Sequence, residues 1–304
     1  MEKQIKDAIK RLVPYRLVLL RRDLLPLWAR LTKKNMRRKD MIPILHFHLV
    51  DHCNLNCRGC DNFSPLAKDV FTDVAVFERD CRRMAELAGG RNRIAEIQLL
   101  GGEPLLHPQA TSFMEIARRY FPETPVNLVS NGLLLPKQGD GFWQCCKRHG
   151  IHIIVTKYPV RLDHQEIERL AGQHGVELSY YGSTDVVEKT MECVPLDLEG
   201  RQDARDSFLR CARANRCIAL DNGKIYTCSL IPYVKYFNRP FNQRLEVTAA
   251  DCLDIYKVGS LDEILDFLCK PMPFCRYCDV KGTKRGIKFG VSRKEITEWI
   301  GERR

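Results

Sequence analysis

Short apolar segments alternate with amphipathic segments from residue 42 to about residue 182, and this alternation limits the possible folds more than any other feature of the sequence. Strands that alternate with helices in this way form mainly parallel sheets, with a helix crossing between consecutive strands. We predict strands at residues 43–50, 94–100, 125–130, 151–156 and 176–181. The predicted fold class is therefore α/β, with ligands at the carboxyl ends of the strands, where such sheets bind them.

The segments between the predicted strands have the apolar spacing of amphipathic helices. The first of two such segments carries on one helical face the residues Phe77, Cys81, Met84 and Ala88. The second carries on one face the residues Phe113, Ile116, Ala117 and Tyr120. We therefore expect Cys81 to fill the core, as Cys145 and Cys146 do beside Phe142.

Three cysteines, Cys53, Cys57 and Cys60, stand within eight residues, directly after the first predicted strand. Three thiolates can each bind one iron of a four-iron cluster and leave the fourth iron without a protein ligand. A structural zinc site is the alternative, but it usually needs four protein ligands, often in two Cys-x-x-Cys pairs. A fourth ligand is missing nearby, so the spacing favours a cluster with one open iron.

A second motif follows the second predicted strand, and consists of Gly101, Gly102, Glu103 and Pro104. Two glycines allow a ligand to approach the backbone closely, and the Glu103 carboxylate can accept a hydrogen bond from an ammonium group. The third predicted strand ends in Ser130, Asn131 and Gly132.

In this order, each at the end of a strand, these motifs resemble those of the radical S-adenosylmethionine (SAM) superfamily. The resemblance implies a partial (β/α)6 barrel over residues 41–190 and a [4Fe-4S] cluster on the three cysteines. It also implies that the methionine amino group of SAM is held by Gly101, Gly102, Glu103 and Pro104. Ser130 or Asn131 would support the ribose of SAM.

The fourth predicted strand ends in Thr156, Lys157 and Tyr158, where many members of the superfamily have a Ser-x-Asp-type stretch. The resemblance implies that Thr156 helps to hold SAM. Lys157 and Tyr158 are then candidate catalytic residues that bind or deprotonate the substrate, unless both are simply solvated. On the first strand, His46 and His48 alternate with apolar residues and could face the interior, although a hydrogen-bonded structural role is favoured for them.

One position departs from the superfamily pattern, which usually has an aromatic residue just before the third cysteine, beside the adenine. Here that residue is Gly59. Phe63 is a candidate to fill the space instead.

The last third of the chain carries a second group of cysteines. The turn signal Asp221-Asn222-Gly223 between two apolar runs predicts a hairpin. Cys211, Cys217 and Cys228 stand around this hairpin, and the pair Cys275 and Cys278 follows much later.

This arrangement resembles the auxiliary-cluster domains of radical SAM proteins, and the single late pair resembles the shorter twitch type more than the two-cluster SPASM type. The resemblance implies a small domain over residues 191–304 with a second [4Fe-4S] cluster on Cys211, Cys228, Cys275 and Cys278. Cys217 could replace one of the last two. A zinc ribbon on the same four thiolates is the structural alternative.

The two ends of the chain differ in character. Residues 1–40 hold thirteen Lys or Arg against four Asp or Glu, a net charge of +9 out of +11 for the chain. They form a basic amphipathic segment that either packs on the barrel or contacts an anionic membrane surface or substrate. At the other end, Ser292 and Glu295 predict a capping box that opens a helix.

Fourteen cysteines without a signal peptide or a membrane-spanning stretch indicate a reducing cytoplasm and metal ligation, with peripheral contact at the inner membrane face through residues 1–40 as an option. The residues in and around the motifs resemble those of glycosyltransferase-associated radical SAM proteins, and the arrangement with a single auxiliary cluster resembles that of an aminocyclitol dehydrogenase. This implies hydrogen abstraction from a small-molecule or lipid-linked sugar or a cyclitol, with oxidation or epimerisation as the outcome. An electron donor such as flavodoxin or ferredoxin would be a partner.

Two other functions stay open. The first is radical SAM modification of a ribosomal peptide, and the second is a non-enzymatic zinc and nucleic-acid-binding protein. Nucleic acid is the less favoured partner, because the charge lies on one terminal arm and no RNA-binding module is recognisable.

Overall fold

The computed structural model describes residues 24, 27–181 and 190–301. Within these residues the largest sheet has eight strands in the order β5-β4-β3-β2-β1-β7-β8-β9. Its strands are β1 Ile44–Val50, β2 Ile97–Gly101, β3 Val126–Ser130, β4 Ile151–Val155, β5 Leu178–Tyr180, β7 Cys217–Asp221, β8 Lys224–Tyr226 and β9 Leu253–Asp254. A separate antiparallel pair joins β6 Thr190–Cys193 to β10 Lys284–Lys288.

All five predicted strands are present within a few residues of their predicted bounds, and they pair in parallel. The α/β fold with a partial barrel is thereby confirmed. A sixth parallel strand, β7, pairs with β1 on the edge opposite to β2. The predicted hairpin is also present, because Asn222 and Gly223 have positive φ angles of 47° and 76° and connect β7 to antiparallel β8.

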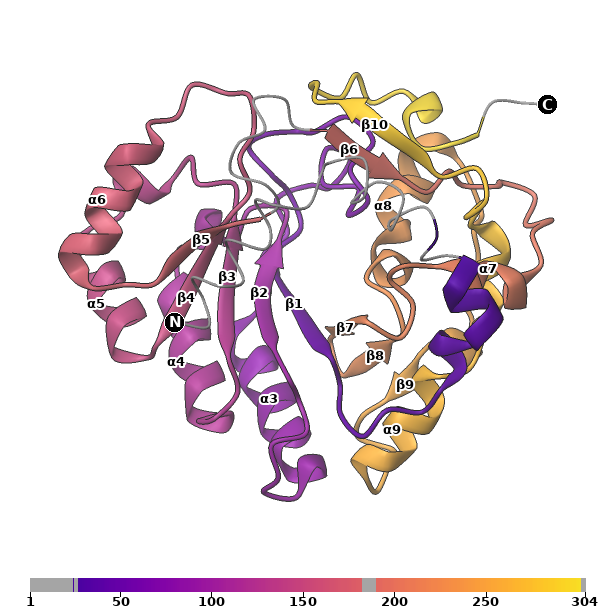
Figure 1. Cartoon of the computed structure of the whole chain (residues 1–304), viewed down its shortest axis with the longest axis horizontal. Coiled ribbons are helices and arrows are strands. Elements are labelled where there is room, and N and C mark those ends of the chain that lie inside the picture. Colours follow the sequence, from indigo (N-terminus) through magenta and orange to yellow (C-terminus); the bar gives the residue numbers. More distant parts are fainter. Residues whose placement is uncertain (1–23, 25–26, 182–189, 302–304) are drawn as a thin grey trace.

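Four helices lie along the outer side of the curved sheet (Figure 1). They are α3 Val74–Ala88, α4 Ala110–Tyr120, α5 Asp140–Arg148 and α6 His164–His174. Asp73 begins α3 by accepting hydrogen bonds from the backbone N–H groups of Ala75 and Val76. The core predictions are confirmed here, because Cys81, Cys145 and Cys146 are buried in the cluster between sheet and helices.

The two faces of the sheet have opposite character, because successive side chains of a strand point to opposite faces. The face toward these helices is apolar and buried, with side chains such as Leu45, Phe47 and Leu99. The opposite face carries His46, His48 and, in register with His46, Gln98. The concave side of the sheet is therefore polar in its central strands.

The remaining helices are α7 Ala204–Arg210, α8 Leu230–Phe241 and α9 Leu261–Leu268. Short 3-10 helices occupy Lys34–Met36, Pro104–Leu106, Leu135–Lys137, Ala249–Asp251, Pro273–Tyr277 and Ile296–Glu298. A second apolar cluster includes Phe63, Tyr233, Phe237 and Trp299. Since β7, β8 and β9 extend the main sheet, the sheet continues across the predicted boundary at residue 190.

The predicted C-terminal helix is wrong. Lys294 has a φ of 58°, which interrupts a right-handed helix, and the Ser292 hydroxyl accepts a hydrogen bond from the Lys294 N–H instead of opening a helix. Only the 3-10 turn Ile296–Glu298 follows, and it brings Trp299 into the second apolar cluster.

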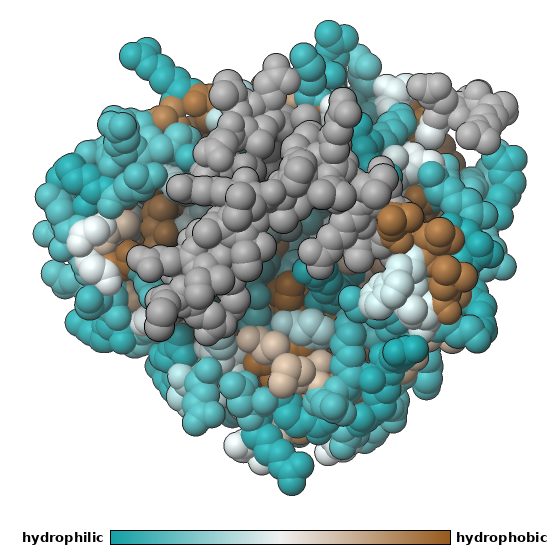
Figure 2. Space-filling model, viewed as in Figure 1, coloured by the Kyte–Doolittle hydropathy of each residue, from teal (hydrophilic) through white to brown (hydrophobic). Residues whose placement is uncertain are grey.

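Most of the basic N-terminal segment, residues 1–23 and 25–26, lies outside the described residues. Residues 27–32 are helical and expose Leu27, Trp28 and Leu31. Apolar atoms gather at the right of Figure 2, over the indigo helical segment of Figure 1. The described helices include none with the length and apolar content that crossing a bilayer requires.

Candidate metal and cofactor site

The loop after β1 brings Cys53, Cys57 and Cys60 together. Two residues with positive φ, Asn56 at 49° and Gly59 at 62°, turn the chain between the cysteines. Burial, followed by the neighbouring Cys60 and Cys53 thiols, raises the pKa of the Cys57 thiol to about 12. The three thiols therefore lie close enough to repel one another as thiolates, and bound metal ions would displace their protons.

The C-terminal segment covers this cysteine loop, a contact that the sequence analysis missed. The N–H of Arg58 donates to the carbonyl of Gly290 (2.7 Å), and the N–H of Ser292 donates to the carbonyl of Asn56 (2.7 Å). The Trp299 indole N–H donates to the carbonyl of Cys60 (2.9 Å). Residues 290–299 thus hold the loop in shape from a position more than 200 residues away.

The structure explains why Gly59 stands where an aromatic residue is usual. Its φ is +62°, and a Cβ there would lie 3.2 Å from the carbonyl oxygen of Glu298. The expectation that Phe63 fills the adenine space is wrong, because Phe63 is 1% exposed and packs against Phe237 and Trp299 in the second apolar cluster.

Glu103 is fully buried and joins the ends of β2 and β3. Its carboxylate accepts hydrogen bonds from the Ser130 hydroxyl (2.8 Å) and from the backbone N–H groups of Asn131 (2.9 Å) and Leu105 (3.1 Å). Burial raises the pKa of Glu103 to about 7, although these three donors act in the opposite direction. The predicted residues Glu103, Ser130 and Asn131 therefore form one hydrogen-bonded group.

Asn131 links this group to the cysteine loop. Its side-chain amide donates to the Asn54 side-chain oxygen (2.7 Å) and lies 3.7 Å from the Cys53 sulfur. The ends of β1, β2 and β3 therefore meet at one place, as the strand-end motifs predict.

The two glycines of the second motif allow two backbone segments of this chain to lie in close contact. A Cβ on Gly101 would lie 2.1 Å from the carbonyl oxygen of Val50, and one on Gly102 would lie 2.0 Å from that of His52. The glycines thus allow β2 to approach the segment that leads to Cys53, which differs from the expectation that they open the backbone to a ligand. Pro104 is buried at the start of the 3-10 helix Pro104–Leu106.

The residues after β4 are placed differently from the sequence expectation. The Thr156 N–H donates to the Ser130 carbonyl (3.0 Å), so this residue lies beside the Glu103 group. The Lys157 ammonium stands 4.0 Å from the centre of the Tyr180 ring, and Lys157 is therefore packed on an aromatic face.

Tyr158 is a poor candidate for a base. Its hydroxyl is within hydrogen-bonding reach of the Cys57 thiol, and burial together with the Cys57, Cys60 and Cys53 thiols raises its pKa well above the usual value. The Tyr158 hydroxyl is suited to donate to the Cys57 sulfur, and its catalytic role stays a prediction.

The concave face of the sheet carries buried polar atoms without a partner among the described residues. These atoms are both ring nitrogens of His46, Nε2 of His48 and the hydroxyl of Tyr233. The His48 ring stacks on the Tyr233 ring at 3.7 Å, and its Nδ1 lies 3.2 Å from the Asp51 carboxylate. Tyr236 donates to the same carboxylate. The sequence favoured a hydrogen-bonded structural role for His46 and His48. His48 has such a contact with Asp51, whereas neither ring nitrogen of His46 has one among the described residues.

The C-terminal cysteines form a second group. Burial, followed by the Cys211 thiol, raises the pKa of Cys228 to about 12, and the pKa of Cys275 is raised by burial and by both Cys211 and Cys228. The same neighbours and Cys275 raise the pKa of Cys278. These four thiols therefore lie near one another.

Cys217 stands at the start of β7, where burial raises the pKa of its thiol and the Cys211 thiol acts in the same direction. The Cys217 thiol in turn helps to raise the pKa of Cys228.

Neither group of cysteines has the tight spacing of a single-metal site. Across the described part of the chain, the only set of three or more possible ligand atoms within 4.8 Å of one another consists of Glu115, Cys145 and His149. Four thiolates on one tetrahedral zinc would lie about 3.8 Å apart, given a Zn–S distance of about 2.3 Å. A four-iron cluster holds its thiolates farther apart, because each binds a different iron.

Residues 48–156 match the sequence model of the radical SAM superfamily, and this range contains the three cysteines, Glu103, Ser130 and Asn131. This part of the chain is therefore similar to the radical SAM superfamily. The GTP 3',8-cyclase of Paenarthrobacter nicotinovorans is 29% identical over 97 residues, which cover 31% of this chain and 26% of that protein. The match thus spans about a quarter of the relative's length.

Two solved structures are similar to this chain. The crystal structure of BtrN in complex with AdoMet and 2-DOIA has a TM-score of 0.46 and 16% identity, covering 79% of this chain and 93% of that one. Native anSMEcpe with bound AdoMet has a TM-score of 0.35 and 19% identity, covering 45% and 43%. Within residues 48–156, the group of Glu103, Ser130 and Asn131 stands beside the cysteine loop.

Proposed function

We propose that this chain is a radical SAM enzyme that acts on a sugar or cyclitol. The observation that carries the proposal is the hydrogen-bonded contact between the Glu103 group and the cysteine loop through Asn131, inside the range that matches the superfamily. The thiol donor set fits a four-iron cluster with one open iron. When bound, the cluster and SAM supply a 5′-deoxyadenosyl radical that removes a hydrogen atom from the substrate.

The residues of this chain prepare the site for a positively charged ligand. Glu103 offers a buried carboxylate whose oxygens are already oriented by Ser130, Asn131 and Leu105. An ammonium group placed beside it would favour the ionised carboxylate and lower its raised pKa. Ser130 and Asn131 would thereby position the acceptor of the methionine amino group.

The proposed substrate class rests on the polar atoms of the concave face. A buried polar atom without a partner costs about 1–3 kcal/mol, and His46, His48 and Tyr233 leave four such atoms in the described residues. A ligand with several hydroxyl groups would supply donors and acceptors to all of them. Because His48 is held by Asp51 through Nδ1, its Nε2 can accept the proton of a substrate hydroxyl.

We further propose that Cys211, Cys228, Cys275 and Cys278 hold a second, fully ligated [4Fe-4S] cluster. The spread of the thiols supports a cluster over a single zinc ion. Such a centre could take up the second electron and yield net oxidation of an alcohol to a ketone. Epimerisation is the alternative outcome, and would need a hydrogen donor such as Cys193 or Cys217.

Two surfaces bear on partners. The exposed apolar residues Leu27, Trp28 and Leu31 belong to the basic N-terminal segment and support peripheral contact with an anionic membrane or a lipid-linked sugar. A one-electron donor such as flavodoxin or ferredoxin is required by the proposed chemistry.

The test is 5′-deoxyadenosine release by anaerobically reconstituted protein with a low-potential reductant, against a panel of nucleotide-linked sugars, lipid-linked sugars and cyclitols. The proposed function predicts one substrate class that raises release above the background, with the mass of the product two hydrogens lower. Stimulation by a precursor peptide and by no member of the panel would favour the ribosomal-peptide alternative. Zinc without iron after reconstitution would overturn the enzyme proposal.

His48→Phe tests the polar face separately, since it keeps a ring that can stack on Tyr233 and removes Nε2. We expect background release to persist and substrate-stimulated release to be lost. Cys269→Ala is the matched control for the cysteine variants, because Cys269 is half-buried, belongs to neither cysteine group and donates only to the Asp266 carbonyl.

A further inference from the structure

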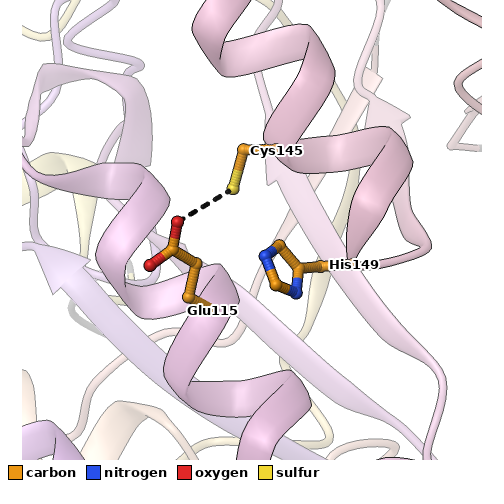
Figure 3. Close-up of side chains that lie close together, drawn as sticks. All are labelled: Glu115, Cys145 and His149. Atoms are coloured by element: carbon orange, nitrogen blue, oxygen red, sulfur yellow. Dashed lines mark hydrogen bonds between the residues drawn. The ribbon is translucent and has the colours of Figure 1, made fainter.

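Three side chains of metal-ligand type meet on the outer surface, away from both cysteine groups. Glu115 comes from α4, Cys145 comes from α5, and His149 stands directly after α5 (Figure 3). His149 lies two residues before β4 begins, so the three residues stand at the amino ends of the parallel strands. The radical SAM site lies at the carboxyl ends, and the two sites are therefore on opposite edges of the sheet.

The geometry of the three side chains suits one metal ion. Cys145 and His149 are four residues apart and project to the same side of the helix end. One ligand atom from each residue lies within 4.8 Å of the other two, and the Cys145 sulfur is 3.9 Å from the Glu115 Oε1. Zinc bonds of about 2.0–2.3 Å place ligand atoms about 3.3–3.7 Å apart in a tetrahedron. Rotation of the exposed Glu115 side chain can bring its carboxylate oxygen most of the way to these distances.

The two adjacent cysteines are both buried, but their sulfur atoms face different surroundings. Cys146 is fully buried, with its sulfur 3.8 Å from the Met114 sulfur. The Cys145 sulfur instead faces Glu115 and the Thr111 carbonyl oxygen. Glu115 and His149 also line a surface hollow, together with Arg118, Arg119 and Arg148. Figure 3 shows the Cys145 thiol and the Glu115 carboxylate directed toward each other, with the His149 ring beside them.

The backbone around His149 is held firmly, and two of the three nearby arginines, Arg118 and Arg119, have other partners. The His149 N–H donates to the Cys145 carbonyl (3.0 Å), and the His149 carbonyl accepts from the Arg118 guanidinium (2.7 Å). Arg118 also donates to three carbonyl oxygens at the end of α4, and Arg119 pairs with Glu78 at 2.7 Å. Arg148 contributes a positive charge near the Cys145 thiol.

The ligand set selects the class of metal. A thiolate and an imidazole favour zinc and similar transition metals over Mg²⁺ and Ca²⁺, which prefer oxygen ligands. One thiolate and one carboxylate would balance the charge of a divalent ion, and three protein ligands leave a fourth position for water. Binding would form a metal–sulfur bond and release the thiol proton to solvent.

We propose that Glu115, Cys145 and His149 bind one zinc ion that fastens α4 to the end of α5. The site is independent of the two cysteine groups and of the proposed radical chemistry.

The test uses protein loaded with its iron–sulfur clusters. The protein is equilibrated with zinc chloride and desalted, zinc and iron are counted by mass spectrometry, and zinc X-ray absorption identifies the ligands. We expect one tightly bound zinc per chain, one sulfur in its first shell and an unchanged iron content. Cys145→Ser should weaken zinc binding by about 100-fold or more, because the softest ligand is lost.

Cys146→Ala is the matched control, and should bind zinc as the wild type does. His149→Gln is the second ligand variant, since a change after the helix end is less disruptive to folding than one at Cys145. Equal zinc binding by wild type, Cys145→Ser and His149→Gln would overturn the proposal. So would an absorption spectrum with four sulfur ligands, which would place the zinc on the C-terminal cysteines and count against the proposed second cluster instead.

Discussion

The cysteine loop after β1 and the C-terminal cysteine group offer the same chemical ligand in different numbers. The loop supplies Cys53, Cys57 and Cys60, whereas the C-terminal half brings four thiols together. Three thiolates leave one iron of a four-iron cluster open, and four leave none. Glu103 and Asn131 also stand beside the loop alone. The number of thiolates and the neighbouring Glu103 carboxylate therefore both support the proposal that SAM binds at the loop.

The two groups are nevertheless connected. Asp61, next to Cys60, forms an ion pair with Arg213, which stands two residues after Cys211. Asp61 acts first among the causes that raise the pKa of the Arg213 guanidinium, and the Cys228 and Cys211 thiols act in the same direction. This ion pair therefore links the two cysteine loops.

The largest effect is expected from removing the three thiols of the loop. Changing Cys53, Cys57 and Cys60 together to Ala should abolish 5′-deoxyadenosine release and leave about half of the iron. The measurement is chromatographic detection of 5′-deoxyadenosine alongside an iron count, with Cys269→Ala as the control. Continued release by the triple variant would show that the open iron lies elsewhere.

Removal of the four C-terminal thiols should separate SAM cleavage from substrate oxidation. The variant with Cys211, Cys228, Cys275 and Cys278 changed to Ala should still release 5′-deoxyadenosine, while the oxidised product disappears. Product and 5′-deoxyadenosine are quantified in the same reaction. If the folded variant forms product at the wild-type rate, the C-terminal group has no redox role and the comparison between the two groups fails.

A smaller effect concerns the stability of metal-free protein. Burial raises the pKa of Glu103 to about 7, so between about pH 4.5 and pH 7 the folded chain holds a proton that the unfolded chain has lost. Its contribution to stability is complete below the unfolded pKa and is lost as the pH rises through 7, on the order of 3 kcal/mol in all.

Glu103→Gln should therefore flatten the pH dependence of the free energy of unfolding in this window, measured by urea denaturation at several pH values. The same variant should bind SAM more weakly in the reconstituted protein. An unchanged slope together with unchanged SAM affinity would mean that Glu103 neither titrates there nor accepts the ammonium group.

The smallest effect is expected at Tyr158. Tyr158→Phe removes a hydroxyl within hydrogen-bonding reach of the Cys57 sulfur, and hydrogen bonds to cluster sulfurs raise the reduction potential. We expect a lower reduction potential for the loop cluster, measured by redox titration. We also expect 5′-deoxyadenosine release to decrease by less than about tenfold. A complete loss of 5′-deoxyadenosine release with an unchanged reduction potential would support the catalytic role that the sequence suggested for Tyr158.

The sequence predicts the parts of this protein that depend on residues close together in the chain. The five strands and the meeting of Cys53, Glu103 and Asn131 follow from apolar periodicity and from the rule that parallel strands end at one edge. The turn at Asn222 likewise follows from the positive φ that its residue type tolerates.

The sequence does not predict the contacts made by distant segments. No pattern places Trp299 on the Cys60 carbonyl, β7 beside β1, or Tyr233 against the His48 ring. The C-terminal capping signal fails for a related reason, because the backbone at Lys294 is set by packing on the cysteine loop and not by local helix preference. Such contacts arise from the tertiary fold, which overrides local propensity.

Mössbauer spectroscopy of protein reconstituted with ⁵⁷Fe, recorded with and without SAM, tests the central contrast between the two cysteine groups most directly. We predict about eight irons per chain in two four-iron clusters, with SAM changing the signal of one iron only, the one without a cysteine ligand. A spectrum from four irons, or one in which SAM changes no iron site, would contradict this account.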